Sequence, residues 1–228
     1  MATRLVLIRH GQGRVNLAQK WAGLVGCAGL TDLGRRQVAA LAAHWKGTGT
    51  RPDALLTSPV QRARETADLL AAELGGLSVT MDCALCELHF GAADGLTWQE
   101  HAERYGAFDL LREPSRQFAP GGESWADVRQ RVRTFLQACA ARYAGRSVAM
   151  VTHAGFIVAS VLEFGRDSTV DGAALDPEFT SLTQWDVLDG RWTLVSLASV
   201  GARRIGGHAL DPGSEARLPG GLIGQEGS

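Results

Sequence analysis

Two arginines and two histidines follow three apolar runs of the sequence, at the points where buried strands would end. Arg9 and His10 follow the first run, Arg62 comes shortly after the second, and His153 follows the third. Taken singly, each has an ordinary explanation as a structural histidine or a solvated arginine. Together they supply converging cations, and arginine forks match the geometry of phosphate oxygens. The set therefore predicts a binding site for a small, multiply charged anion.

A carboxylate and an amide could complete this site. Glu87 follows the apolar segment Ala84–Cys86, beyond a further predicted strand, and could reach the same rim. A carboxylate at an anion site suits general acid–base chemistry, although a surface carboxylate is the simpler alternative. Asn16 could donate a hydrogen bond to the anion, and local backbone capping is its alternative role.

The four cysteines do not resemble a disulfide framework in a chain of 228 residues. Cys83 and Cys86 form a C-x-x-C pair, which is compatible with zinc or redox chemistry. No second Cys or His pair at ligand spacing follows, and Cys86 lies in an apolar stretch. We therefore expect structural thiols and no metal site.

The elements that would position these residues are alternating strands and helices. Continuous apolar runs predict buried strands, and apolar residues at helical spacing predict amphipathic helices. The expected strands are residues 5–8, 54–57, 77–81 and 147–152. The expected helices are residues 31–47, 59–74 with Pro59 in the first turn, 98–105, 108–112, 124–145 and a segment after His153. Asp189-Gly190, between two alternating segments, predicts a β-hairpin.

This alternation predicts an α/β fold, a three-layer αβα sandwich with a mostly parallel central sheet. Ligands of such sheets bind outside the carboxyl ends of the strands. Arg9, His10 and His153 stand at those ends, and Arg62 lies shortly beyond one of them. We therefore expect the four side chains to meet at one edge of the sheet.

Composition limits the classes of protein to consider. The chain is 45% hydrophobic, and its 23 Lys and Arg against 24 Asp and Glu give a formal net charge of -1. Nucleic-acid binding rests on accumulated positive charge, so we expect no nucleic-acid partner. The first apolar run is too short for a signal peptide, and no stretch is long enough for a membrane span. The default expectation is a cytoplasmic protein without a membrane partner.

Four motifs resemble those of the histidine phosphatase superfamily, also called phosphoglycerate mutase-like. They are Leu7–Gly11 with Asn16, Ser58–Ala67, Glu87–Thr97, and Gly121–Ser124 followed by Val151–Gly155. The resemblance covers about residues 4 to 200 and implies a histidine phosphatase domain over residues 1–200, with a small helical cap insertion at about residues 88–122. Residues 201–228 hold eight of the 28 glycines, and we expect a flexible glycine-rich tail there.

The resemblance implies a mechanism with a phosphohistidine intermediate. His10 would be the nucleophile, and nearby Arg9 and Arg62 would lower its pKa and keep it neutral. Arg9, Arg62 and His153 would bind the phosphoryl oxygens, with Asn16 as a further donor. Glu87 would act as the general acid and base. No metal or organic cofactor is implied.

The motif after the acid favours a phosphatase over a mutase. The sequence Glu87-Leu88-His89-Phe90-Gly91 resembles the phosphatase branch, which implies a phosphomonoesterase acting on a small phosphorylated metabolite. A phosphoglycerate-type mutase and a non-catalytic phosphate-binding module are the alternatives. Ala22 stands where phosphatase-type members often carry a polar residue that contacts phosphate. The family includes dimers, so this chain could form a homodimer, and the sequence leaves its oligomeric state undecided.

Overall fold

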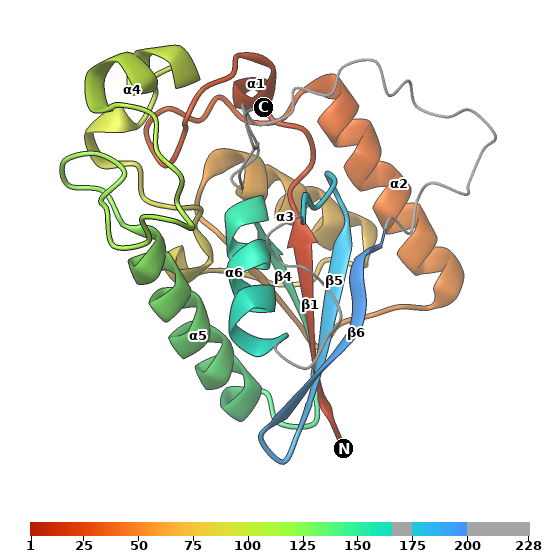
Figure 1. Cartoon of the computed structure of the whole chain (residues 1–228). Helices are drawn as coiled ribbons and strands as arrows, with labels where there is room; N and C mark the ends of the chain where they lie inside the picture. Colours follow the sequence, from red (N-terminus) through yellow and green to blue (C-terminus); the bar gives the residue numbers. More distant parts are fainter. Residues whose placement is uncertain (166–174, 200–228) are drawn as a thin grey trace.

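The sheet at the centre of the molecule carries strands from both ends of the chain (Figure 1). In this computed structural model, the structure describes residues 1–165 and 175–199. The glycine-rich tail expected over residues 201–228 lies outside the described residues, and that expectation stays a prediction.

Six strands form one mixed sheet in the order β3-β2-β4-β1-β5-β6. The strands are β1 (Thr3–Arg9), β2 (Ala54–Thr57), β3 (Val79–Met81), β4 (Ser147–Thr152), β5 (Leu182–Leu188) and β6 (Arg191–Ser199). The first four are parallel, and β5 pairs antiparallel with both β1 and β6. Asp189 and Gly190 turn the β5–β6 hairpin with φ values of 50° and 77°, as the type I′ turn requires. The predicted, mostly parallel α/β sheet is confirmed.

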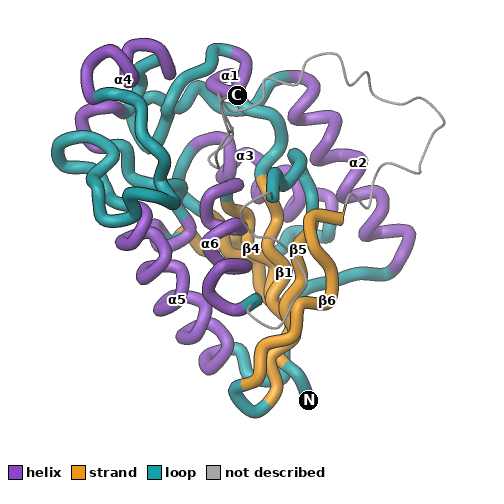
Figure 2. Tube along the Cα trace, viewed as in Figure 1, coloured by secondary structure: helices purple, strands orange, loops and turns teal. Residues whose placement is uncertain are grey.

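Helices cover both faces of the sheet (Figure 2). The helices are α1 (Arg14–Leu17), α2 (Asp32–Thr48), α3 (Gln61–Glu73), α4 (Trp98–Tyr105), α5 (Trp125–Arg142) and α6 (Ala154–Phe164), with short 3-10 turns η1 (Cys83–Leu85) and η2 (Gly91–Ala93). Side chains of α2 and α3 pack in one apolar cluster and those of α5 and α6 in the other. Successive residues of β1 serve the two clusters in turn, Leu7 the second and Ile8 the first. The molecule therefore has three layers, a sheet between two layers of helices, with one buried apolar core on each face of the sheet.

Side-chain caps explain where the long helices begin. Thr31 accepts a hydrogen bond from the Gly34 backbone at the start of α2. Ser124 and Asp127 form a reciprocal capping box at the start of α5. Both starts agree with the sequence prediction.

One helix prediction placed the start two residues early, and one was wrong. The helix predicted from Pro59 begins at Gln61, because the Ser58 hydroxyl accepts the Val60 N–H at 3.2 Å and turns the chain first. The helix predicted over residues 108–112 is a turn, in which the Asp109 carboxylate accepts the Leu111 N–H at 2.8 Å. In both places a short polar side chain competes with the helix for backbone donors.

The segment predicted as a cap, at about residues 88–122, packs its own aromatic side chains together. The His101 ring stacks on Phe118 with centroids 4.1 Å apart, and its Nε2 lies 2.9 Å from the Phe118 carbonyl oxygen. Trp21, which precedes this segment in the sequence, packs edge-on against the Phe118 ring with centroids 5.0 Å apart. These aromatic side chains form part of the core, and a cap role for the segment stays a prediction.

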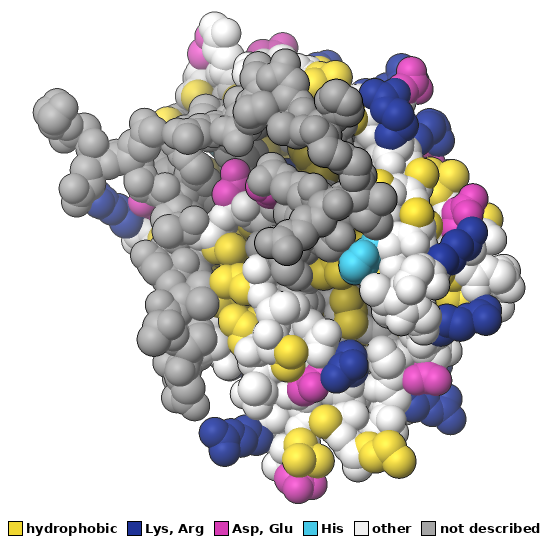
Figure 3. Space-filling view, turned by 90° about the vertical axis from the view of Figure 1, so that its right-hand side faces the viewer, with side chains coloured by type: hydrophobic (Ala, Val, Ile, Leu, Met, Phe, Trp, Pro, Cys, Tyr) yellow, Lys and Arg dark blue, Asp and Glu magenta, His cyan; other side chains and the backbone are white. Residues whose placement is uncertain are grey.

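Among the described residues, no helix combines the length and apolar character needed to cross a membrane. Basic and acidic side chains are interspersed over the described surface of one face (Figure 3). This mixture agrees with the formal net charge of -1 of the full chain.

Candidate active site

The carboxyl ends of β1 and β4 bring His10 and His153 together. Arg9 and Thr152 are partners in the parallel β1–β4 ladder, and the His10 N–H donates to the Thr152 carbonyl at 3.0 Å. The two histidines therefore stand side by side, with ring centroids 5.1 Å apart. Both rings are buried, at 2% and 0% exposure.

Arg62 connects the two histidine rings from α3. Its Nε lies 2.9 Å from His10 Nε2, and its Nη2 lies 3.0 Å from His153 Nδ1. Arginine can only donate, so each of these imidazole nitrogens is the acceptor. The structure thus brings together three of the four side chains that the sequence predicted to converge.

The hydrogen bonds fix which nitrogen of each ring carries the proton. His10 Nδ1 lies 2.7 Å from the Gly11 carbonyl, so Nδ1 donates and Nε2 carries the lone pair. His153 Nε2 lies 2.9 Å from the Ser58 hydroxyl oxygen and donates to it. The Nε2 lone pair of this buried, neutral imidazole accepts the Arg62 N–H, and such a lone pair can act as a nucleophile once that bond is given up.

Burial and neighbouring arginines hold both histidines neutral. Burial lowers the pKa of His10 well below its ordinary value, and the charges of Arg62 and Arg9 lower it further. Burial and Arg62 likewise lower the pKa of His153. The lowering of the His10 pKa by its two arginine neighbours is the effect expected from the sequence.

Arg9 reaches the site from the last position of β1. Its guanidinium donates to the Pro177 carbonyl, lies 3.6 Å from the Asp176 carboxylate and stacks on Phe179 at 4.1 Å from the ring centroid. Burial lowers the pKa of Arg9, whereas Asp176 and Glu87 raise it. Its Nε is buried and has no hydrogen-bond partner among the described residues. That N–H is a donor available to an anion beside His10.

Phe179 is a site residue that sequence reasoning missed. Its ring centroid lies 5.9 Å from that of His10 and it also covers the Arg9 guanidinium. The signal that could have found it is its place directly before the predicted hairpin, whose first strand lies beside β1.

Glu87 lies against the N-terminus of α6, next to the segment that carries His153. Its Oε2 accepts the Gly155 N–H at 3.3 Å, and its Oε1 accepts the Leu88 N–H at 3.2 Å. A Cβ atom added to Gly155 would lie 2.2 Å from Glu87 Oε1. Only glycine at this position lets the carboxylate approach the helix N-terminus, two residues from His153.

Asn16 makes the local contact that was its alternative interpretation. Its Oδ1 accepts the Gly13 N–H at 3.0 Å, which closes the first turn of α1. A Cβ added to Gly13 would lie 3.0 Å from both this oxygen and the Arg62 side chain. The turn therefore packs against Arg62, and donation from Asn16 to a substrate stays a prediction.

The backbone of Ala22 provides the contact at the position where the sequence departs from the family pattern. Its carbonyl oxygen accepts a hydrogen bond from Arg62 Nη1 at 2.8 Å. The same nitrogen lies 3.5 Å from Cys27 Sγ. Ala22 thus helps to orient Arg62 without a polar side chain.

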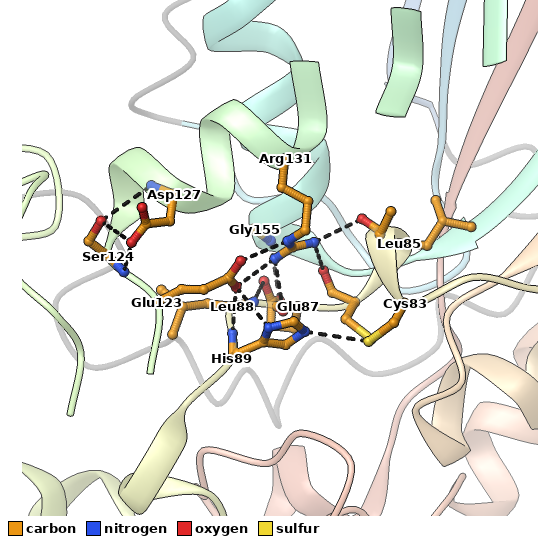
Figure 4. Close-up of polar contacts among 12 residues, drawn as sticks. Cys83, Leu85, Glu87, Leu88, His89, Glu123, Ser124, Asp127, Arg131 and Gly155 are labelled. Carbon is orange, nitrogen blue, oxygen red and sulfur yellow. Dashed lines mark hydrogen bonds and ion pairs between the residues drawn. The ribbon is translucent and has the colours of Figure 1, made fainter. Parts of the chain in front are cut away.

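Arg131 of α5 holds the segment that carries Glu87, as Figure 4 shows. Its Nη1 donates to the carbonyls of Ala84 and Cys86 at 2.8 and 2.9 Å, and its Nη2 donates to that of Glu87 at 3.2 Å. Two further bonds join Arg131 to the Glu123 carboxylate at 2.8 and 2.7 Å. Burial alone would raise the pKa of Glu123, but Arg131 and His89 together outweigh it and the pKa lies below its usual value. Sequence reasoning missed Arg131.

Comparison with known proteins gives one family. The model of the histidine phosphatase superfamily (branch 1) matches residues 5–200. The solved structure of YhfR from Bacillus stearothermophilus superposes with a TM-score of 0.76 at 28% identity, covering 88% of this chain and 100% of that one.

Named relatives include phosphatases. A glucosyl-3-phosphoglycerate phosphatase of Mycobacterium tuberculosis is 34% identical over 84% of this chain and 87% of its own. A metal-independent phosphoserine phosphatase of Arabidopsis thaliana is 30% identical over 87% of this chain and 82% of its own. A bifunctional Mycobacterium tuberculosis protein is 40% identical over 66% of this chain, which matches only 41% of the relative's length.

Proposed function

Since this chain belongs to the histidine phosphatase superfamily (branch 1), we propose that it is a phosphomonoesterase that works through a phosphohistidine on His10. The observation that carries the proposal is the hydrogen-bonding state of His10. Its Nδ1 is committed to the Gly11 carbonyl, while its Nε2 lone pair points at Arg62. A neutral nucleophile beside a cation is poised to attack a phosphoryl group that the same cation binds.

The first half-reaction transfers the phosphoryl group to the enzyme. His10 Nε2 attacks phosphorus while the bond from phosphorus to the ester oxygen breaks. Arg9 and Arg62 would bind the non-bridging oxygens and neutralise charge on the group in transfer. His153 would join them by turning its Nε2–H from the Ser58 hydroxyl to one of these oxygens. Glu87 gives its proton to the leaving oxygen, and the alcohol departs.

The second half-reaction returns the enzyme to its starting state. Glu87, now a carboxylate, takes a proton from a water molecule, whose oxygen attacks the phosphorus of phosphohistidine. The N–P bond breaks, its electron pair returns to His10 Nε2, and inorganic phosphate leaves. Every proton is accounted for by Glu87, so the proposed steps need no metal or organic cofactor.

The substrate class follows from the relatives and from the site. Phosphoserine and glucosyl-3-phosphoglycerate, named in two relatives, are small phosphorylated metabolites. Arg62, His10 and His153 lie together at one edge of the sheet, in a cluster that suits one phosphoryl group, and we propose a small phosphorylated metabolite as substrate. A cytoplasmic location, the absence of a nucleic-acid partner and a homodimer stay predictions.

Phosphate release tests the proposal. The full chain is assayed with 4-nitrophenyl phosphate, phosphoserine and a panel of sugar and glycerate phosphates. We expect turnover that falls at least about 1000-fold in His10→Ala and is unchanged in His44→Ala, a half-buried histidine on α2.

Three outcomes would contradict it. No turnover together with phosphate binding would favour a non-catalytic module. Isomerisation of phosphoglycerate that outruns phosphate release would favour a mutase. Failure to trap an acid-labile phosphoenzyme by rapid denaturation at alkaline pH, even in Glu87→Gln where its hydrolysis lacks a base, would contradict a phosphohistidine intermediate.

A further inference from the structure

Cys83, Cys86 and His89 form a second cluster of reactive side chains, beside the phosphoryl site but outside the proposed reaction. Their ligand atoms all lie within 4.8 Å of one another. Cys83 Sγ is 2.7 Å from Cys86 Sγ and 3.5 Å from His89 Nε2. Cys86 is buried, whereas the His89 side chain is 44% exposed. The cluster is therefore formed in the interior and reachable from solvent.

The separations approach those of ligands around one ion. Zinc binds thiolate sulfur at about 2.3 Å and imidazole nitrogen at about 2.0 Å, so tetrahedral ligand atoms lie about 3.6 to 3.8 Å apart. The 3.5 Å between Cys83 Sγ and His89 Nε2 already meets this requirement. The two sulfurs would have to move apart by about 1 Å to reach it. Thiol rotation about the Cα–Cβ bonds supplies such a movement without a change of backbone.

The second nitrogen of His89 provides an independent observation. Nδ1 of its ring lies 3.5 Å from a carboxylate oxygen of Glu123, and the backbone N–H of His89 donates to the same oxygen at 2.8 Å. Histidine ligands of metals commonly give their second ring nitrogen to a carboxylate, which fixes the ring with the other nitrogen toward the ion. Glu123 is itself held by two bonds from Arg131. Figure 4 shows the imidazole between Glu123 and Cys83.

The backbone that carries the thiols is also held in place. The Asp82 carboxylate accepts the Ala84 N–H at 2.8 Å, and the Cys86 N–H donates to the Cys83 carbonyl at 2.9 Å. Arg131 donates hydrogen bonds to the Ala84 and Cys86 carbonyls of this turn. The short 3-10 turn η1 thereby presents both sulfurs to the same point, so little ordering is left for an ion to impose.

We propose that Cys83 Sγ, Cys86 Sγ and His89 Nε2 bind one thiophilic divalent cation of the zinc class, with water as the fourth ligand. Two thiolates and one imidazole match the ligand preference of zinc rather than that of magnesium or calcium. Binding releases the two thiol protons to solvent. The site is separate from the phosphoryl site, and its occupancy does not depend on the proposed function.

The position of the cluster gives the ion a structural role. Glu87 lies between Cys86 and His89 in the sequence, so an ion bound to both would cross-link the turn that holds the proposed acid. The ion takes no part in the proposed phosphoryl transfer. It would stabilise the folded state, because a ligand that binds only the folded chain raises its free energy of unfolding.

Cobalt provides a spectroscopic probe of this site. The full-length protein is kept reduced with a phosphine, freed of metal by a chelator and titrated with Co²⁺. We expect one equivalent to bind with the sulfur-to-cobalt charge-transfer band and the intense visible bands of tetrahedral thiolate coordination. Zn²⁺ should displace the cobalt and raise the melting temperature.

Matched variants identify the ligands. Cys83→Ser should abolish the charge-transfer band or weaken it together with at least a 10-fold loss of affinity, and His89→Gln should weaken binding comparably. Glu123→Gln should weaken binding about 10- to 100-fold without removing the band. Cys139→Ser, a buried cysteine on α5 outside the cluster, should bind as the unaltered chain does.

Two results would overturn the proposal. One is the absence of stoichiometric Co²⁺ binding by the reduced protein, including the case in which the two thiols only form a disulfide on oxidation. The other is an unchanged cobalt spectrum in Cys83→Ser. His10→Ala should keep full cobalt binding, so a failure of the metal site and a failure of the proposed phosphatase function are read separately.

Discussion

Arg62 Nε and His10 Nε2 lie 2.9 Å apart, so the group that would bind the phosphate also donates a hydrogen bond to the atom that would attack it. Before substrate arrives, this contact keeps the Nε2 lone pair directed and the ring neutral. A phosphoryl group entering the site would offer Arg62 stronger, charge-assisted bonds, and the lone pair of His10 would then be released.

Arg62→Lys should show whether catalysis depends on the positive charge of Arg62 alone or also on the shape of its guanidinium. Lysine keeps the positive charge but has no planar fork to reach both histidines, so kcat should fall about 100- to 1000-fold. The assay is steady-state release of phosphate. Arg64→Lys, an exposed neighbour on the same helix, is the control and should leave kcat unchanged. Equal losses in both variants would show that the effect arises from helix α3 as a whole.

Glu87→Gln should affect substrates according to their leaving group. Alkyl phosphates need a proton on the departing oxygen, so their turnover should fall about 100-fold or more. A nitrophenolate departs without that proton, so 4-nitrophenyl phosphate should still load His10, and the phosphoenzyme should accumulate because its hydrolysis lacks a base. Rapid-quench measurement would show a burst of nitrophenol. The absence of a burst, with His10 loaded as slowly by 4-nitrophenyl phosphate as by an alkyl phosphate, would contradict the assignment of Glu87 as acid and base.

Gly155→Ala should displace Glu87 without unfolding the chain. The new Cβ would lie 2.2 Å from Glu87 Oε1, and the carboxylate must move. Because a displacement near 1 Å can cost about 100-fold in rate, kcat should fall by about that factor. The melting temperature should change little, since only a side-chain end is displaced.

Gly47→Ala is the matched control for that substitution. Gly47 lies within α2, and a Cβ there would meet nothing within 4 Å. It should stabilise the fold by about 0.5 to 1 kcal/mol and leave kcat unchanged. A loss of activity in Gly47→Ala would mean that rates report global stability rather than the position of Glu87.

Acid should destabilise the fold through His10 and His153. Burial, with Arg62 next in effect, holds both pKa values well below the ordinary 6.5, so the folded chain stays deprotonated where the unfolded chain binds protons. Stability is therefore fully present above pH 6.5 and is lost as the pH falls below it, by about 1.4 kcal/mol per pH unit for each histidine.

Urea unfolding of the unaltered chain and of His10→Gln between pH 5 and 8 measures this effect. The difference between the two free energies of unfolding cancels the carboxylates that both share. Below pH 6.5 the slope for His10→Gln should be shallower by about 1.4 kcal/mol per pH unit. Parallel curves would show that His10 titrates alike in the folded and unfolded chains.

Much of the fold could be predicted because its main signals are local. The apolar runs of residues 54–57 and 147–152 coincide with β2 and β4, since strands buried on both faces have few polar positions to confuse the pattern. Caps at Thr31 and Ser124 mark helix starts by direct bonds to nearby N–H groups. Pro59 misled the prediction because the Ser58 hydroxyl delayed the helix by two residues.

The parts of the site that could not be predicted depend on contacts between distant segments. Phe179 lies against His10 only because β5 pairs with β1. Arg131 reads in the sequence as one more charge on an amphipathic helix, yet it holds the backbone of Glu87 across 44 residues. His89 follows the C-x-x-C pair by three residues. Its proposed role as a metal ligand could be inferred only once Glu123 was seen to lie against its ring.

The register of β1 against β4 has a consequence for substrate range. His10 and His153 leave adjacent parallel strands whose spacing is set by backbone hydrogen bonds at about 4.8 Å, and their rings lie 5.1 Å apart. Side-chain changes elsewhere in the chain cannot easily alter that separation. The loops around the sheet edge are therefore free to diverge and to select new leaving groups, while a transferred phosphoryl group would meet the same pair of imidazoles.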